Sequence, residues 1–315
     1  MPAPRFSICV STCNRAARLP AMIERIWALE GREDAELVVV DNGSRDGTDI
    51  LLRRLVARSS MAMTALREPR PGVSHALNAA LLACAGEILV FTDDDCLVRP
   101  DLLLRYDEMF ADPRLGYAGG AIVLHDPEDF PIAISCTHER IDLTPYDVVK
   151  PGLIQGANMA FRHSALIEIG GFDPNFGAGA PFSGFDVDAC GRASAIGWAG
   201  CFDPGPVVAH HHGRKHAAAM VLLDRYRRGA GAYYAKALVD SPWRARIGAR
   251  WLRASAWHAT TQPRRFVAEM RGALAYLHAR RAGELEPMDP RLAPAPRRAP
   301  APVIPTAIAA SGESP

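Results

Sequence analysis

The chain has 315 residues, 49% of them hydrophobic and 23% charged, which is typical of a globular protein with a full hydrophobic core. No apolar run reaches the roughly 18 residues that cross a bilayer, and the amino terminus lacks the basic start and long apolar centre of a signal peptide. Seven cysteines without a C-x-x-C pair argue against a disulfide framework and a zinc site, so we expect a cytoplasmic protein.

The net charge of +1 conceals an uneven distribution. Residues 214–281 carry 15 Lys and Arg against 3 Asp and Glu, a local balance of +12, so the rest of the chain sums to −11. An acidic front part and an Arg-rich back part indicate that the two have different roles.

Strands and helices are predicted to alternate in the amino-terminal third. Apolar runs predict strands at 6–11, 36–41 and 87–92, with a weaker candidate at 61–66. Helical patterns lie between them at 18–29, 46–58 and 73–85. Alternation at this spacing is typical of βαβ units, and so of a doubly wound, mostly parallel α/β sheet with helices on both faces.

The rest of the chain changes character near residue 214. Up to that point we expect helices at 101–110, 164–170 and 185–197, strands at 116–124, 153–162 and about 205–213, and a Gly/Pro-rich loop at 171–184. Three further helices are predicted at 216–240, 242–258 and 264–281. From about Pro287 the Pro/Ala-rich composition predicts a disordered tail.

The stretch FTDDDC, Phe91 to Cys96, places three carboxylates directly after an apolar strand. Asp41 also ends a predicted strand, and the carboxyl ends of parallel strands share the edge of the sheet where ligands bind. Carboxylates held close together take up a proton or bind a cation, and oxygen ligands suit Mg²⁺ or Mn²⁺. The alternative is a solvated turn that leads into the next helix.

Seven segments in chain order resemble family 2 glycosyltransferases, which have the GT-A fold, use nucleotide-sugar donors and invert the anomeric carbon. They are VSTCNRAARL, VVVDNGSRDGT, PGVSHALNAAL, GEILVFTDDDCLVRPD, GANMAFRHSALIEIGGFD, GFDVDACGRASAIGW and VVAHHHG. The resemblance implies a glycosyltransferase that moves a sugar from a nucleotide-diphosphate sugar to a hydroxyl acceptor, in cell-surface polysaccharide or glycoconjugate synthesis. It also implies a GT-A catalytic domain at 1–213, a helical extension at 214–286 packed on it and a tail at 287–315.

The same resemblance implies which residues bind the donor nucleotide. Thr12 and Asn14 would lie in the loop that contacts the nucleotide, and Asp41 would accept a hydrogen bond from its base. Asn78 and His75 fall in a segment that lies near the donor in relatives, and only Asn78 is taken as a donor-binding residue. A place on the helix surface is the alternative for both, and a turn or helix-capping role is the alternative for Asp41.

For the three consecutive carboxylates, the resemblance implies that Asp93 approaches the ribose and that Asp94 also lies at the donor. Asp95 would bind the divalent metal, Mn²⁺ or Mg²⁺, that bridges the diphosphate. His210 would complete the metal shell, and His212 is the alternative if the strand register slips by two residues. Imidazole is an acceptable ligand for Mn²⁺ and a less natural one for Mg²⁺.

The segment GFDVD supplies the expected catalytic base. Family members usually have Glu-Asp-x-Asp here, and the first Asp after the Glu, Asp186 in this chain, is the proposed base. Phe185 replaces the Glu, which puts acceptor handling in question. Simple helix N-capping is the alternative role for Asp186, and Asp188 could pair with Arg192.

The Arg-rich helices carry Trp243, Trp251 and Trp257. The favoured interpretation is that Trp and Leu pack on the catalytic domain while Arg is solvated. Alternatives are contact with an anionic membrane, at the inner face of the plasma membrane, or with a lipid-linked acceptor. No nucleic-acid reader motif is present, so nucleic acid is not expected as a partner. A nucleotidyltransferase and a non-catalytic sugar-nucleotide-binding protein remain as alternative functions.

Overall fold

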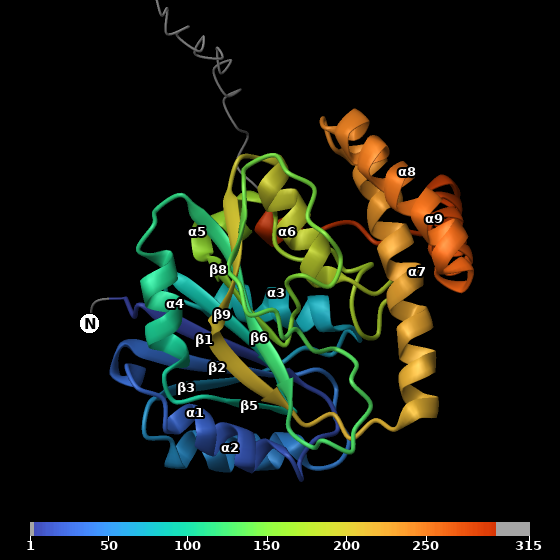
Figure 1. The fold of residues 1–315 in the computed structure, drawn as a ribbon. Helices are drawn as coiled ribbons and strands as arrows, with labels where there is room; N and C mark the ends of the chain where they lie inside the picture. Colours follow the sequence, from blue (N-terminus) through green and yellow to red (C-terminus); the bar gives the residue numbers. More distant parts are fainter. Residues whose placement is uncertain (1–2, 294–315) are drawn as a thin grey trace, which may run out of the picture.

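The structure is a computed structural model that describes residues 3–293. One curved sheet forms its centre, with helices against both faces and three long helices at one side (Figure 1). The strands follow the order β3-β2-β1-β4-β8-β6-β9-β5, with β7 beside β9. They are β1 (Phe6–Thr12), β2 (Ala35–Asp41), β3 (Ala62–Arg67), β4 (Ile88–Asp93), β5 (Cys96–Val98), β6 (Leu115–Leu124), β7 (Ile141–Leu143), β8 (Asn158–Arg162) and β9 (Ala199–His210).

The helices of the α/β part are α1 (Leu19–Trp27), α2 (Thr48–Arg58), α3 (Val73–Ala83), α4 (Leu102–Phe110), α5 (His163–Glu168) and α6 (Phe185–Ala195). Alternate residues of the central strands build two hydrophobic layers, because successive side chains point to opposite faces. Ile8 and Val90 belong to the layer that contains α1, α2 and α4, whereas Cys9 and Phe91 belong to the layer that contains α3 and α6. The predicted doubly wound α/β fold is confirmed.

The sheet is parallel from β3 to β4 and mixed beyond it. β8 runs antiparallel to β4 and β6, and the three-residue strands β5 and β7 run antiparallel to β9. β9 runs parallel to β6, with a register shift in the stretch that contains Pro204 and Pro206. Proline cannot donate a ladder hydrogen bond, which explains why the pairing is interrupted there.

The helical extension consists of α7 (His216–Asp240), α8 (Arg244–Thr261) and α9 (Pro263–Ala282). Glycines allow α7 and α9 to approach closely. A Cβ atom at Gly231 would lie 1.8 Å from the carbonyl oxygen of Glu269, and one at Gly272 would lie 1.9 Å from that of Arg228. Within residues 3–293, none of the helices combines the length and the apolar character needed to span a membrane.

After α9 the chain turns back toward the α/β domain, as the red segment in Figure 1 shows. We call residues 284–293 the C-terminal segment; it contains the short 3₁₀ helix Pro290–Leu292. A disordered tail is expected from Pro287, but residues 287–293 lie against the domain, with the side chains of Asp289 and Leu292 buried. The rest of the expected tail, residues 294–315, lies outside the described residues.

Candidate active site

Three predicted site residues lie at the carboxyl ends of adjacent parallel strands. The register pairs Thr12 with Asp41 and Ser11 with Asp93, so β1, β2 and β4 end at the same edge of the sheet. The hydroxyl of Thr12 donates a hydrogen bond to Asp94 Oδ2 at 2.7 Å. The edge therefore carries polar side chains from three strands, as expected from the topology.

Asp41 is 2% exposed, and its two carboxylate oxygens have different environments. Oδ1 accepts a hydrogen bond from the backbone NH of Ser44 at 2.8 Å, whereas Oδ2 is buried and has no hydrogen-bond partner among residues 3–293. A buried carboxylate oxygen without a partner is costly, so this atom is suited to accept a hydrogen bond from a ligand.

Asn14 joins the loops that follow β1 and β2. It adopts a left-handed backbone conformation, with φ of 56°, which Asn tolerates better than most residues. Its backbone NH donates to Ser44 Oγ, and its side-chain oxygen accepts from the backbone NH of Arg45, both at 2.8 Å. These bonds fix the rim of the site next to Thr12 and Asp41.

A possible metal site lies where β5 pairs with β9. Ligand atoms of Asp93, Asp95, Cys96 and His210 lie within 4.8 Å of one another. His210 Nε2 is 3.2 Å from Asp95 Oδ1, and its Nδ1 is 3.2 Å from the carbonyl oxygen of Ala133. A carbonyl that accepts from Nδ1–H leaves Nε2 directed at the carboxylate, which is the usual outer support of a metal-binding histidine.

The pKa shifts of Asp93, Asp95 and Cys96 differ, and they indicate which of these side chains are suited to bind a cation. Burial and the adjacent Asp95 raise the pKa of Asp93 to about 7. Burial also opposes ionisation of Asp95, but the hydrogen bond to His210 and the charge of Arg15 outweigh it and lower the pKa of Asp95. Burial raises the pKa of the Cys96 thiol well above its usual range, so Cys96 stays protonated and is a poor ligand. The remaining oxygen and imidazole donors fit a divalent cation such as Mn²⁺.

His212 does not occupy an equivalent position. Its Nδ1 accepts a hydrogen bond from the backbone NH of Arg214 at 2.9 Å and lies 3.5 Å from Asp129 Oδ2. His212 Nε2 is buried and has no hydrogen-bond partner among residues 3–293, but only His210 has its ligand atom in the group with Asp93 and Asp95. The geometry therefore favours His210 as the candidate ligand.

Asp186 lies in the first turn of α6, and Gly184 is the N-cap, so Asp186 is not the helix cap. Its Oδ2 accepts from the backbone NH of Gly156 at 3.0 Å, and its Oδ1 accepts from the NH of Val187 at 2.8 Å. Burial raises the pKa of Asp186. Its charge also contributes to the raised pKa of Asp93, so the two carboxylates lie close enough to interact across the site.

Phe185, which replaces the usual Glu, has an apolar environment. Its ring packs edge-on against Phe172 with the ring centroids 5.7 Å apart. A Cβ atom at Gly156 would lie 2.3 Å from Phe185 Cζ, so the ring is in close contact with the loop that holds Asp186. Phe185 thus fixes the start of α6 by packing, and it offers no carboxylate to an acceptor.

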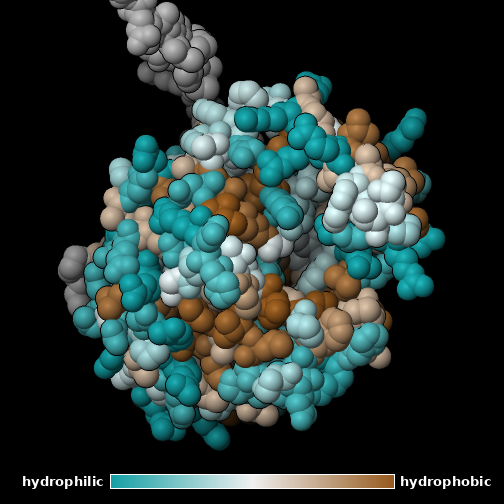
Figure 2. All heavy atoms as spheres, viewed as in Figure 1, coloured by the Kyte–Doolittle hydropathy of each residue, from teal (hydrophilic) through white to brown (hydrophobic). Residues whose placement is uncertain are grey.

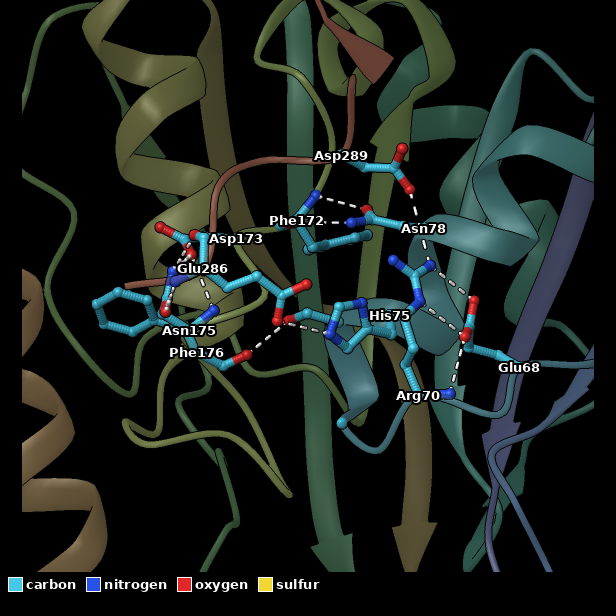
Figure 3. Close-up of polar contacts among 12 residues, drawn as sticks. Glu68, Arg70, His75, Asn78, Phe172, Asp173, Asn175, Phe176, Glu286 and Asp289 are labelled. Carbon is cyan, nitrogen blue, oxygen red and sulfur yellow. Dashed lines mark hydrogen bonds and ion pairs between the residues drawn. The ribbon is translucent and has the colours of Figure 1, made fainter. Parts of the chain in front are cut away.

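The side chain of Asn78 binds the backbone of a later loop. Its side-chain oxygen accepts from the backbone NH of Phe172, and its amide donates to the carbonyl of the same residue, both at 2.8 Å (Figure 3). The side chain is buried, and both ends of its amide are used. Asn78 thus holds the loop before α6 through Phe172, and the donor-binding role implied by the resemblance stays a prediction.

Two residues near the site were missed from the sequence. Arg15 lies 3.7 Å from Asp94 and 3.6 Å from Asp95, and its place next to Asn14 in the VSTCNRAARL segment was a usable signal. Tyr226 comes from α7 and is 40% exposed as a whole, but desolvation and the charges of Asp93 and Asp186 raise its pKa to about 12. No local pattern identified Tyr226, because only the packing of the extension brings it to the site.

Comparison with known proteins identifies the family. The family model described as glycosyl transferase family 2 matches residues 7–170. The chain belongs to this family. The glycosyltransferase YfnE of Bacillus subtilis is 33% identical over 102 residues, which cover 32% of this chain and 26% of YfnE. The PGL/p-HBAD biosynthesis glycosyltransferase of Mycobacterium bovis is 37% identical over 106 residues, 33% of this chain and 41% of that protein. The matches thus cover well under two thirds of these relatives.

Solved structures confirm the GT-A fold. A mannosyltransferase from Pyrobaculum calidifontis, in complex with GDP-Man and Mn²⁺, aligns with a TM-score of 0.64 over 87% of each chain at 23% identity. Staphylococcus aureus TarS 1–349, in complex with UDP-GlcNAc, aligns with a TM-score of 0.59 over 88% of this chain and 87% of TarS 1–349 at 15% identity. At these identities the likeness concerns the fold.

Proposed function

We propose that this chain is a glycosyltransferase that moves a sugar from a nucleotide-diphosphate sugar to a hydroxyl acceptor, with inversion and with the help of a divalent cation. The observation that carries the proposal is the convergence of Asp93, Asp95 and His210 within 4.8 Å, at the sheet edge that also carries Asp41. Asp186 faces the same group from α6.

On the donor side, each residue has a distinct task in this proposal. Asp41 Oδ2 accepts a hydrogen bond from the nucleotide base, and the loop around Thr12 and Asn14 holds the nucleoside. Asp95 and His210 would hold the cation, and Asp93 and Asp94 would orient the ribose and the sugar. A divalent cation bound there would stabilise the negative charge of the departing diphosphate. The imidazole in the donor set favours Mn²⁺ over Mg²⁺.

On the acceptor side, Asp186 takes the proton from the attacking hydroxyl. A retaining mechanism with a covalent intermediate would need a second carboxylate as nucleophile. The nearby carboxylate Asp188 does not suit that role, because it pairs with Arg192 at 2.8 Å and with Lys236. One base and one displacement therefore predict inversion.

The neighbours suggest the first donors to test. The mannosyltransferase holds GDP-Man and TarS holds UDP-GlcNAc, so both sugar nucleotides belong in a screen of this chain. The acceptor we propose is a hydroxyl-bearing glycan or a lipid-linked intermediate of cell-surface polysaccharide or glycoconjugate synthesis.

A lipid-linked acceptor would be reached most easily from a membrane surface, and α8 supports a peripheral contact with anionic lipid. Trp251 stacks on Tyr234 of α7, but Leu252 and Trp257 are 72% and 55% exposed. Residues 244–261 contain several Arg and no acidic residue. Figure 2 shows hydrophobic and hydrophilic side chains intermixed on the outer edge that α8 and α9 form. This composition suits the headgroup region of an anionic bilayer.

Flotation with phosphatidylglycerol vesicles tests this contact. The parent should float with the vesicles at low salt, and Leu252→Ser with Trp257→Ser should abolish flotation. Leu104→Ser, which changes an exposed Leu on α4, is the matched control and should float like the parent. A parent that stays in the pellet at low salt contradicts the contact.

The function itself is tested by incubating the protein with sugar nucleotides and Mn²⁺. Release of nucleoside diphosphate that depends on metal and on acceptor supports the proposal. Release of pyrophosphate from nucleoside triphosphates would identify a nucleotidyltransferase instead. Binding of the donor without turnover over long incubation would identify a non-catalytic sugar-nucleotide-binding protein.

A further inference from the structure

The C-terminal segment is attached to the α/β domain near its start, at Glu286, and near its end, at Leu292. The side chain of Asn175 donates to the carbonyl of Glu286 at 2.8 Å and accepts from its backbone NH at 2.9 Å (Figure 3). Leu292, 2% exposed, lies against Gly171, where an added Cβ would be 2.6 Å from Leu292 Cδ1. These contacts involve backbone and buried surface, so they fix the path of the segment.

Two carboxylates of the segment, at Glu286 and Asp289, reach residues 68–75, which comprise the loop after β3 and the first turn of α3. Glu286 Oε2 lies 3.2 Å from His75 Nε2, and Asp289 Oδ2 lies 3.9 Å from Arg70 Nη2 (Figure 3). Arg70 in turn holds Glu68 through two hydrogen bonds of 3.0 and 2.9 Å. The segment therefore contacts both ends of residues 68–75.

The opposite side of this loop is attached next to Asp41. Asn42 accepts a hydrogen bond from the backbone NH of Gly72 at 2.9 Å and donates to the carbonyls of Glu68 and Arg70 at 3.0 and 2.7 Å. The backbone NH of Glu68 also donates to the carbonyl of Asp41 at 2.9 Å. Residues 68–72 are thus hydrogen-bonded to Asp41 and Asn42. They lie directly beside Asp41, the residue that we propose to bind the nucleotide base.

We propose that the C-terminal segment is a positioning element of the donor site, in which Glu286 and Asp289 hold the loop at 68–75 against Asn42 and Asp41. The inference rests on the proposed function, because it needs Asp41 to contact the donor. In this arrangement neither Glu286 nor Asp289 touches the donor. They act through His75 and Arg70, and the expected consequence of losing them is weaker nucleotide binding with an unchanged chemical step.

The test is a double variant of the full chain, Glu286→Ala with Asp289→Asn. It removes the two carboxylates that reach residues 68–75 and keeps a side-chain oxygen at 289, which now accepts from the backbone NH of Arg291 at 3.0 Å as the cap of the 3₁₀ helix that carries Leu292. The Asn175 bonds involve the backbone of Glu286 and stay in place. We expect the Kd for nucleoside diphosphates with Mn²⁺ to rise about tenfold, the effect of losing roughly one charge-assisted hydrogen bond. The kcat at saturating donor should stay within about twofold of the parent, since the carboxylate of Asp186 is held by the backbone NH groups of Gly156 and Val187, outside residues 68–75.

The matched control is Glu284→Ala, which removes an exposed carboxylate from the same segment and should bind nucleotide like the parent. Hydrogen exchange of the ligand-free double variant should show faster exchange at residues 68–75 than in the parent. Equal exchange, or equal Kd in parent and double variant, overturns the inference while leaving the proposed function intact. If the parent binds none of GDP, UDP, ADP and CDP, the proposed function fails, and the inference fails with it.

Discussion

His210 Nε2 lies 3.2 Å from Asp95 Oδ1 at the carboxyl edge of the sheet. The two residues are far apart in the sequence, and the antiparallel pairing of β5 with β9 brings them together, with Cys96 opposite His210. The backbone NH of His211 also donates to the carbonyl of Asp95 at 2.8 Å, which fixes the two chains next to the ligands. A three-residue strand thus sets the geometry of the proposed metal site.

Replacing His210 by Ala should weaken the binding of Mn²⁺ in the presence of nucleoside diphosphate by at least about tenfold, because one of the few donors is lost. Titration calorimetry with Mn²⁺ measures this. His211→Ala is the control, since His211 is the exposed neighbour on the same strand end, and it should bind Mn²⁺ like the parent. Equal losses in the two variants would show that His210 is not a ligand.

Asp41→Asn should impair binding of the nucleoside and spare binding of the phosphates. The amide can keep the bond from Ser44 NH, but it presents NH₂ where Oδ2 now offers an acceptor. A mispaired buried polar group costs about 1–3 kcal/mol, so nucleoside diphosphate binding should weaken accordingly. The binding of inorganic pyrophosphate with Mn²⁺, measured in parallel, should not change. If both ligands weaken equally, Asp41 does not contact the base.

Lys236 of α7 joins the extension to the catalytic domain. Its Nζ lies 2.7 Å from Asp173 Oδ2 and 2.5 Å from Asp188 Oδ1, and all three side chains are at most 10% exposed. Lys236→Met removes the ammonium group that pairs with the buried carboxylates of Asp173 and Asp188. This loss should lower the free energy of unfolding by about 3–5 kcal/mol.

Denaturant unfolding of the full chain measures that loss. The matched control is Arg228→Met on the same helix, because Arg228 pairs with Asp224 while the two side chains are 49% and 46% exposed, and exposed pairs contribute at most about 1 kcal/mol. Similar small losses in the two variants would argue against the Lys236 pairs as a structural connection between the extension and α6.

The proposed base also predicts a pH dependence. Three titratable groups face Asp186 of α6: Asp93, which lies on β4, Asp188, which lies on α6 itself, and Tyr226, which lies on α7. Burial raises the pKa of Asp186. A base acts in its ionised form, so kcat at saturating donor and metal should fall as the pH decreases through this raised pKa. The acid limb should therefore lie above the ordinary Asp range of about 4. Donor binding measured at each pH separates this limb from losses in binding, and a kcat that stays constant down to about pH 4 would contradict the assignment.

Much of the front half could be predicted because its signals are local. The apolar runs of β1, β2 and β4 have buried residues on both faces, so each reads as a strand, and parallel topology then places Thr12, Asp41 and Asp93 at one edge. The long helices α7, α8 and α9 follow from extended helical patterns between Pro and Gly positions in the same way.

The features that were missed depend on distant partners. β5 has only three residues, too few to show the alternation of apolar and polar residues that predicts a strand. It is a strand because it pairs with β9. The C-terminal segment has the composition of a tail, and only contacts with Asn175 and Gly171 reveal its place. Asn78 lies in the right segment of the sequence, but the position of Phe172 decides what its amide binds.

The most direct test of the account is a comparison of donor binding and sugar transfer in Asp186→Asn. The substitution keeps the size of the side chain and removes the base, so the variant should bind nucleotide sugar and Mn²⁺ like the parent. Transfer should fall by about 10²–10⁴-fold, the usual contribution of a general base. A variant that transfers sugar at the rate of the parent would contradict the central claim.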